Sequence, residues 1–96
     1  NERYNDLNDV LLQIQPGMSL EELKKDDHKY EKLNDYLNLC AEEYFWYKKK
    51  RISEEIWQAG NQGMIDWHNK LKCLQELWQQ ENKRSYYLKD DQDIFA

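Results

Sequence analysis

The sequence of 96 residues is poor in the residues that build β-sheets and turns. It holds a single valine, no threonine, three glycines and one proline. Alternating runs rich in Val, Ile and Thr are typical of strands, and the sequence has none. Its longer apolar patterns repeat at helical spacing instead. The sequence therefore predicts an all-α fold, namely a small antiparallel bundle of about four helices with an aromatic-rich core.

Residue sets for catalysis or metal binding are also lacking. The two histidines, His28 and His68, do not form the Glu-x-x-His pairs that hold di-metal sites in helical bundles. There is no glycine-rich turn around a serine and no glycine-rich loop for phosphate. Cys40 lies in an apolar row, where burial disfavours the reactive thiolate. We therefore expect no catalytic residues, no metal site and no cofactor, and a protein that is not an enzyme.

Long apolar runs are absent as well. A membrane-spanning helix needs about 20 apolar residues, and neither such a segment nor a signal peptide is visible. Cys40 and Cys73 could form one disulfide, but their apolar helical rows favour free thiols and a reducing compartment. The chain begins at Asn1 and not at methionine. We expect a single helical domain, residues 1–96, that lacks an upstream N-terminal segment.

Positively charged residues are the minority: the sequence has 14 Lys and Arg and 19 Asp and Glu, which gives a net charge of −5. Nucleic-acid binders are normally basic, because phosphate neutralisation supplies most of their affinity. We therefore expect no nucleic-acid partner. The four consecutive cations Lys48 to Arg51 are the local exception. They either contact an anionic lipid or nucleic-acid surface or form a solvated helix end.

The sequence does contain amphipathic segments with clear boundaries. Pro16-Gly17 ends the first segment, and Ser19 and Ser53 are in position to cap the helices that follow them. We expect helices at about 2–15, 27–50, 53–70 and 71–82, with a short helical segment at about 19–25. Gly60 and Gly63 interrupt the third long helix, which indicates a close helix–helix approach or a kink.

The segment 27–50 carries the clearest pattern. Its large residues recur at steps of three and four, as in an a/d seam over about three heptads. With three tryptophans from later helices, the seam supplies the expected structural residues. These are Tyr30, Leu33, Leu37, Cys40, Tyr44, Tyr47, Trp57, Trp67 and Trp78.

Four aromatic residues follow one another at 44–47 and sweep roughly 300° of a helix. A helix at the rim of a small bundle cannot bury all four rings. Either this turn lies at the centre of the domain, or one or two rings face a partner. Within the same stretch, either one of Glu42 and Glu43 is half-buried beside a partner, or both are exposed. The candidate interaction surface consists of Phe45, Trp46, Lys48, Lys49, Lys50 and Arg51.

Three segments carry a resemblance to a known family. Residues 39–48 read LCAEEYFWYK, residues 52–57 read ISEEIW, and a later tryptophan, Trp78, follows Gly63-Met64. This pattern resembles a widespread, uncharacterised family of short bacterial helical proteins with an LCxEEyyly-K helix and an IxxExW helix. Members often have an upstream transmembrane helix. Members usually have a second tryptophan between the IxxExW segment and the Gly-Met pair, and this chain has Gly60 or Asn61 at that place. The resemblance supplies no catalytic residue.

These observations favour a non-catalytic helical module for protein–protein interaction. Its partner would be another protein or a second copy of the chain, as a homo-oligomer. The resemblance implies a bacterial, cytoplasmic module, with tethering to the inner face of the membrane through the missing upstream segment as an option. The alternative is a binder of anionic surfaces, lipid or nucleic acid, through Lys48–Arg51. A small regulatory or defence effector is a third hypothesis.

Overall fold

The structure is a computed structural model, and it describes residues 2–82 of the chain, with side-chain burial for residues 6–81. This described part forms five helices. They are α1 (Glu2–Leu11), α2 (Leu20–Leu23), α3 (Asp27–Lys48), α4 (Glu54–Lys70) and α5 (Lys72–Asn82). No strand occurs in this part of the chain. The predicted all-α fold is confirmed, and the predicted short segment is the separate helix α2.

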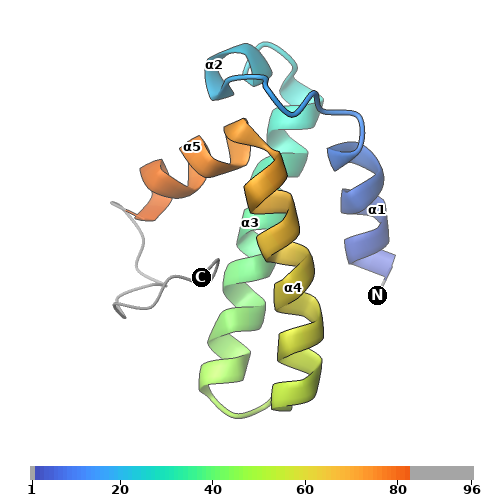
Figure 1. Ribbon diagram of the computed structural model, residues 1–96, viewed down its shortest axis with the longest axis vertical. Coiled ribbons are helices and arrows are strands. Elements are labelled where there is room, and N and C mark those ends of the chain that lie inside the picture. Colours follow the sequence, from blue (N-terminus) through green and yellow to red (C-terminus); the bar gives the residue numbers. More distant parts are fainter. Residues whose placement is uncertain (1, 83–96) are drawn as a thin grey trace.

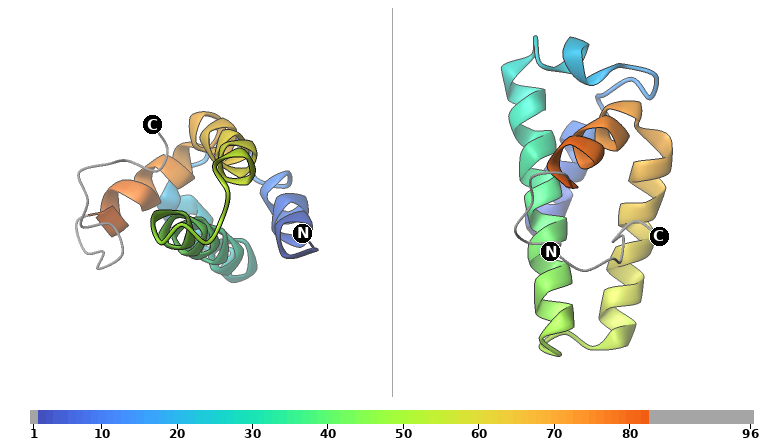
Figure 2. Two further views of the ribbon diagram at one scale, coloured as in Figure 1. Left: turned by 90° about the horizontal axis from the view of Figure 1, so that it is seen from below. Right: turned by 90° about the vertical axis from the view of Figure 1, so that its left-hand side faces the viewer.

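The helices α3 and α4 form an antiparallel hairpin that runs the length of the molecule (Figure 1). The remaining helices surround one half of it: α1 packs on α3, and α5 packs on α2 and α4. Figures 1 and 2 show the other half, which ends in the α3–α4 turn, extending beyond α1, α2 and α5. The end of the hairpin therefore has to be stabilised by α3 and α4 alone, within the described residues.

Side chains cap three of the helices at their first turn. Ser19 Oγ accepts a hydrogen bond from Glu22 N at 3.3 Å, Asp26 Oδ1 from Lys29 N at 3.1 Å, and Ser53 Oγ from Ile56 N at 3.3 Å. Each bond satisfies a backbone donor that has no partner inside its own helix. The starts of α2, α3 and α4 are therefore fixed by local sequence.

The first helix is shorter than expected and ends at Leu11 instead of Gln15. After it, Gln13 N donates to Val10 O and Ile14 N to Leu11 O, so the chain tightens into three-residue turns before Pro16. Ile14 is nevertheless buried, because the tighter turn brings it round to the core.

The break between α4 and α5 is a single extended residue, Leu71, with φ −102° and ψ 114°. Its side chain is completely buried. The next backbone N–H, of Lys72, donates to Pro16 O at 3.0 Å, and Gln75 Nε2 donates to His68 O at 2.8 Å. Each bond thus satisfies one backbone group at the bend, and the boundary predicted between the helices at 53–70 and 71–82 falls at Leu71.

The core contains more of α3 than the a/d seam predicts. Tyr36 and Leu39 are as deeply buried as the seam residues, because α3 packs against α1 and α2 as well as α4. The buried core residues are Leu7, Leu11, Ile14, Leu20, Leu23, Leu33, Tyr36, Leu37, Leu39, Cys40, Ala41, Tyr44, Trp57, Met64, Leu71, Cys73, Leu74, Leu77 and Trp78.

The expected close approach at Gly60 and Gly63 is wrong. A Cβ added at either glycine would meet nothing within 4 Å, and both residues are exposed. Helix α4 runs unbroken through both positions. Nothing in the structure requires glycine at either one.

Candidate interaction surface

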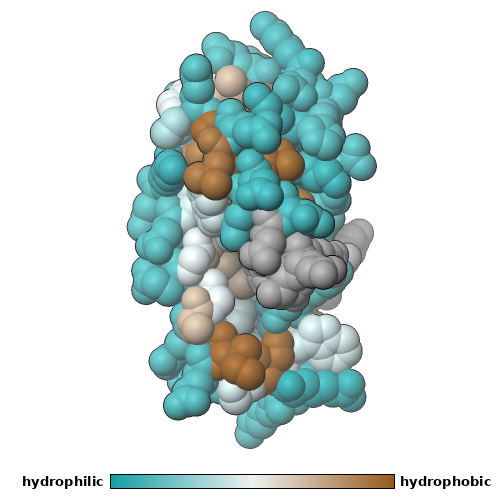
Figure 3. All heavy atoms as spheres, turned by 90° about the vertical axis from the view of Figure 1, so that its right-hand side faces the viewer, coloured by the Kyte–Doolittle hydropathy of each residue, from teal (hydrophilic) through white to brown (hydrophobic). Residues whose placement is uncertain are grey.

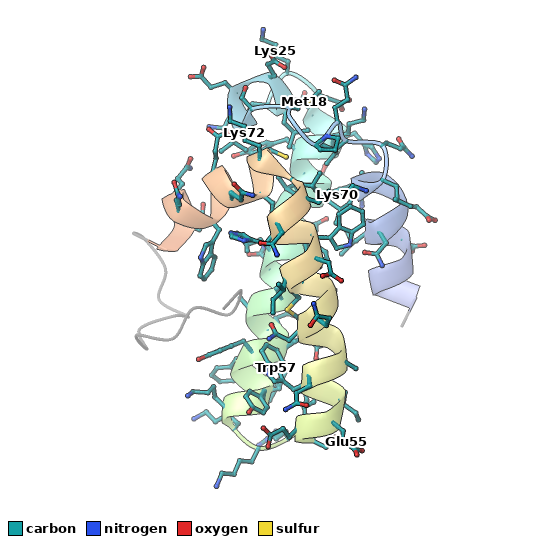
Figure 4. The ribbon with its side chains drawn as sticks, viewed as in Figure 1. Met18, Lys25, Glu55, Trp57, Lys70 and Lys72 are labelled. Atoms are coloured by element: carbon teal, nitrogen blue, oxygen red, sulfur yellow. The ribbon has the colours of Figure 1, made fainter. Side chains whose placement is uncertain are left out.

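An aromatic cluster of Tyr44, Tyr47 and Trp57 joins the ends of α3 and α4. The Trp57 ring stacks on Tyr47, with ring centroids 4.9 Å apart and planes 8° from parallel, and meets Tyr44 edge to face at 5.6 Å. Figure 4 shows Trp57 between the lower halves of the two helices. Tyr44 and Trp57 are buried and Tyr47 is half-buried. This cluster is the core of the hairpin end that the other described helices do not reach.

The two aromatic residues between Tyr44 and Tyr47 point elsewhere. Successive residues of a helix differ by about 100° in direction, and among the described helices only α4 packs beside this end of α3 (Figure 1). Phe45 and Trp46 remain 43% and 39% exposed, and their rings form an edge-to-face pair with centroids 5.3 Å apart. The four rings of the aromatic turn therefore divide. Tyr44 and Tyr47 pack inward on α4, and Phe45 and Trp46 lie at the surface.

The end of α3 is a Schellman motif, which the sequence analysis missed. Lys50 N donates to Tyr47 O at 2.9 Å and Arg51 N donates to Trp46 O at 3.0 Å. Lys50 occupies the left-handed position, with φ 61°. Glycine is usual at that position, and its absence hid the motif. A glycine or asparagine at position 50 would have revealed it, and the sequence has lysine there.

Cations of the same turn lie over the aromatic faces. The guanidinium carbon of Arg51 lies 5.0 Å from the Trp46 ring centroid, and Lys49 Nζ lies 5.5 Å from that of Phe45. Lys48 Nζ lies 5.8 Å from the Tyr44 ring. Such contacts are worth about 0.5–1 kcal/mol each at exposed sites. Two of them place Lys49 on Phe45 and Arg51 on Trp46. We call the exposed surface of this turn the aromatic–basic tip: Phe45, Trp46, Lys48, Lys49, Lys50 and Arg51.

Three of the four cations of the tip lack a carboxylate partner in the described part of the chain. Lys49, Lys50 and Arg51 have no ion pair within residues 2–82, although Glu54 and Glu55 begin the next helix. Beside the tip, a depression of about 620 Å³ is lined by Tyr47, Lys48, Lys50, Ile52, Ser53 and Glu54. Figure 3 shows hydrophobic surface close to the same end of the molecule.

Two further exposed apolar side chains were not anticipated. Ile56 is 65% exposed in the first turn of α4, and Leu12 is 64% exposed just after α1. The neighbour of Ile56, Trp57, takes the inward direction at that turn. Leu12 belongs to the half of the molecule that α1 covers (Figure 1), away from the tip.

The other residues singled out from the sequence have structural contacts. Trp67 is half-buried, and its Nε1 donates to Asn8 Oδ1 at 3.0 Å, which ties α4 to α1. Tyr30 is half-buried against the core and Trp78 is buried on α5. Glu43 is half-buried and Glu42 is exposed, so neither carboxylate is fully buried.

The cysteines are free and buried. Burial raises the pKa of the Cys40 thiol to about 12, against a hydrogen bond with Tyr36 that lowers it, and burial raises the pKa of Cys73 as well. Both thiols are therefore protonated at neutral pH and are poor nucleophiles. Within the described residues, no group of three or more His, Cys, Asp or Glu could hold a metal ion.

Comparisons with protein-family models, with curated proteins and with solved structures find no match to this chain. The family resemblance, carried by residues 39–48, residues 52–57, Gly63-Met64 and Trp78, therefore stays a prediction. In the part of the chain that the structure covers, none of the helices combines the length and apolar character that crossing a membrane requires.

Proposed function

We propose that the protein is a non-catalytic helical module that binds another protein, or a second copy of itself, through the aromatic–basic tip. The observation that carries the proposal is the exposure of two adjacent aromatic rings, Phe45 at 43% and Trp46 at 39%. Aromatic residues and arginine are enriched among the residues that dominate binding energy at protein interfaces. Three of the residues in this tip, Phe45, Trp46 and Arg51, belong to those types.

The surroundings of the two rings support a role in recognition. Tyr44, Tyr47 and Trp57 already supply the core of the hairpin end, so Phe45 and Trp46 are not needed there. The Schellman motif and the cation–ring contacts fix the geometry of the tip before any partner arrives. A surface that is ordered beforehand loses less conformational entropy on binding, which raises affinity.

Site-specific photo-cross-linking tests the proposal. A photoreactive phenylalanine analogue replaces Phe45 in the chain expressed in its host, and in a matched protein it replaces Leu12, which is 64% exposed. We expect position 45, and not position 12, to cross-link to one defined protein or to a second copy. The same partner should be lost from the Phe45→Glu/Trp46→Glu variant, with circular dichroism as the control for folding. Equal cross-linking from both positions contradicts the proposal.

A second candidate function is binding to an anionic lipid surface, and the exposure of all four residues from Lys48 to Arg51 favours it. Clusters of cations beside aromatic residues bind anionic membranes. Sedimentation with vesicles, with and without phosphatidylserine, distinguishes this function from protein binding. Retention that depends on phosphatidylserine, falls with salt and disappears on charge reversal of Lys48–Arg51 would support it.

A further inference from the structure

We infer that the aromatic–basic tip recognises an acidic segment of a partner protein, in which carboxylates flank a large apolar residue. This inference rests on the proposed function and names the chemistry of its partner. It follows from the way the cations are held on the rings and from the charge of the rest of the chain.

Two cations of the tip, Lys49 and Arg51, are held on the aromatic rings without a carboxylate partner in the described residues. Arg51 lies over the Trp46 ring and Lys49 lies over the Phe45 ring. Neither has a carboxylate partner within residues 2–82. A guanidinium group that stacks on a ring keeps N–H donors at its edge, where a carboxylate can accept two parallel hydrogen bonds. The tip thus offers donors beside exposed apolar surface.

The arrangement favours protein carboxylates over a lipid bilayer. Because Lys49 and Arg51 lie over the ring faces, inserting Phe45 and Trp46 into the apolar part of a membrane would carry two charges with them. A peptide avoids this penalty, since its carboxylates approach the cations from the edge while its apolar side chain contacts the uncovered ring surface.

The charge distribution gives the tip its selectivity. Four of the 14 Lys and Arg residues of this acidic chain are consecutive at 48–51. An acidic segment is repelled by the chain as a whole and is attracted locally at the tip, which both orients the encounter and disfavours binding elsewhere. The apolar side chain of the partner segment then supplies the contact with the 43% exposed ring of Phe45.

Selection from a library of random short peptides displayed on phage, with the full chain as bait, tests the inference. We expect the selected peptides to be enriched in Asp and Glu around a large apolar residue. A representative peptide should lose affinity about tenfold or more with a Lys49→Gln/Lys50→Gln/Arg51→Gln variant, which corresponds to about 1.4 kcal/mol. It should also weaken as salt concentration rises.

The matched control is Lys25→Gln/Lys70→Gln/Lys72→Gln, which removes the same charge from three exposed lysines at the opposite end of the molecule (Figure 4). We expect this variant to bind the peptide as the natural chain does, within about twofold, because these lysines lie beyond the screening length of ~10 Å. Equal losses in the two variants would show a nonspecific effect of net charge and would overturn the inference.

The remaining outcomes separate the inference from the proposed function. Peptides that require Phe45 and Trp46 but show no acidic enrichment and ignore the tip variant overturn the inference and leave the proposed function in place. Failure to select any peptide that depends on Phe45 and Trp46 overturns the inference, and the proposed function falls with it only if position 45 also fails to cross-link in preference to position 12. Binding to phosphatidylserine vesicles without any selected acidic peptide assigns the tip to lipid instead.

Discussion

Arg51 contacts Trp46 twice, once through its backbone and once through its side chain. Its N–H donates to the Trp46 carbonyl oxygen at 3.0 Å, and its guanidinium carbon lies 5.0 Å from the centroid of the indole ring. In a Schellman motif these two positions commonly make a hydrophobic contact. Here a cation–π contact takes its place, so the same residues that end α3 also place a positive charge on an exposed ring.

The left-handed residue of this motif gives the first prediction. Lys50 has φ 61°, a conformation that disfavours a side chain with a Cβ by about 1 kcal/mol. We expect Lys50→Gly to raise the free energy of unfolding by about that amount, as measured by urea denaturation. Lys50→Ala is the control, because it removes the charge and keeps the Cβ. If Lys50→Ala stabilises the protein as much as Lys50→Gly, charge and not backbone conformation is the cause.

The exposed glycines of α4 give the second prediction. Because nothing lies within 4 Å of a Cβ at Gly60 or Gly63, alanine fits at both positions. We expect Gly60→Ala and Gly63→Ala each to raise the free energy of unfolding by about 0.5–1 kcal/mol, through helix propensity and a less flexible unfolded chain. The reverse change at the exposed neighbour Ala59→Gly should lower it by a similar amount. Unfolding curves that do not change for the alanine variants would contradict the prediction.

The fold could be predicted from sequence largely because its signals are local. Ser19 and Ser53 cap the helices that follow them, and the absence of Val- and Thr-rich runs excludes sheets. What failed depends on contacts between distant segments. The burial of Tyr36 and Leu39 requires knowing that α1 and α2 pack on α3 away from the seam. The reading of Gly60 failed because a sequence does not show which helix lies opposite.

The candidate site was predictable only in its composition. The aromatic run and the basic run are visible in the sequence. Periodicity, however, identifies only one buried face of a helix, and it does not show which of four consecutive aromatic residues lie on that face. Phe45 and Trp46 are exposed because, in the described residues, α4 is the only helix beside the end of α3, a fact of tertiary structure. The contact of Arg51 with Trp46 depends on the left-handed conformation of Lys50 between them. A lysine at that position does not indicate this conformation in the sequence.

The third prediction concerns pH. Burial raises the pKa of the Cys40 thiol from 9.0 to about 12. Between these values the unfolded chain loses the thiol proton and the folded chain keeps it, so stability is full below about pH 9 and falls as pH rises. The slope for one thiol reaches about 1.4 kcal/mol per pH unit.

Urea denaturation of the natural chain and of Cys40→Ala at about pH 8, 9 and 10 measures this slope. Lysines and tyrosines also titrate in this range, and the variant retains all of them. We therefore expect the stability of Cys40→Ala to fall less steeply above pH 9 than that of the natural chain, whatever its stability at pH 8. Parallel slopes would mean that Cys40 does not keep its proton in the folded state.

The fourth prediction separates the surface rings from the core rings. Trp57 is 8% exposed and contacts both Tyr44 and Tyr47, whereas Trp46 is 39% exposed and contacts Phe45 and Arg51. Truncating a buried tryptophan typically costs about 3–5 kcal/mol, because it removes apolar burial and leaves a cavity. We expect Trp57→Ala to lower the free energy of unfolding by this amount, and Trp46→Ala to lower it clearly less, because much of the Trp46 ring already faces solvent.

Urea denaturation followed by circular dichroism measures both changes. Should Trp57→Ala not fold, Trp57→Phe provides the comparison, since it keeps a ring in the cluster and should cost less than alanine while still exceeding Trp46→Phe. A small cost at position 46 means that natural folding does not require a tryptophan there, so the ring is free to serve recognition. A cost at Trp46 equal to that at Trp57 would place the ring in the folding core and remove the basis for the aromatic–basic tip as a binding surface.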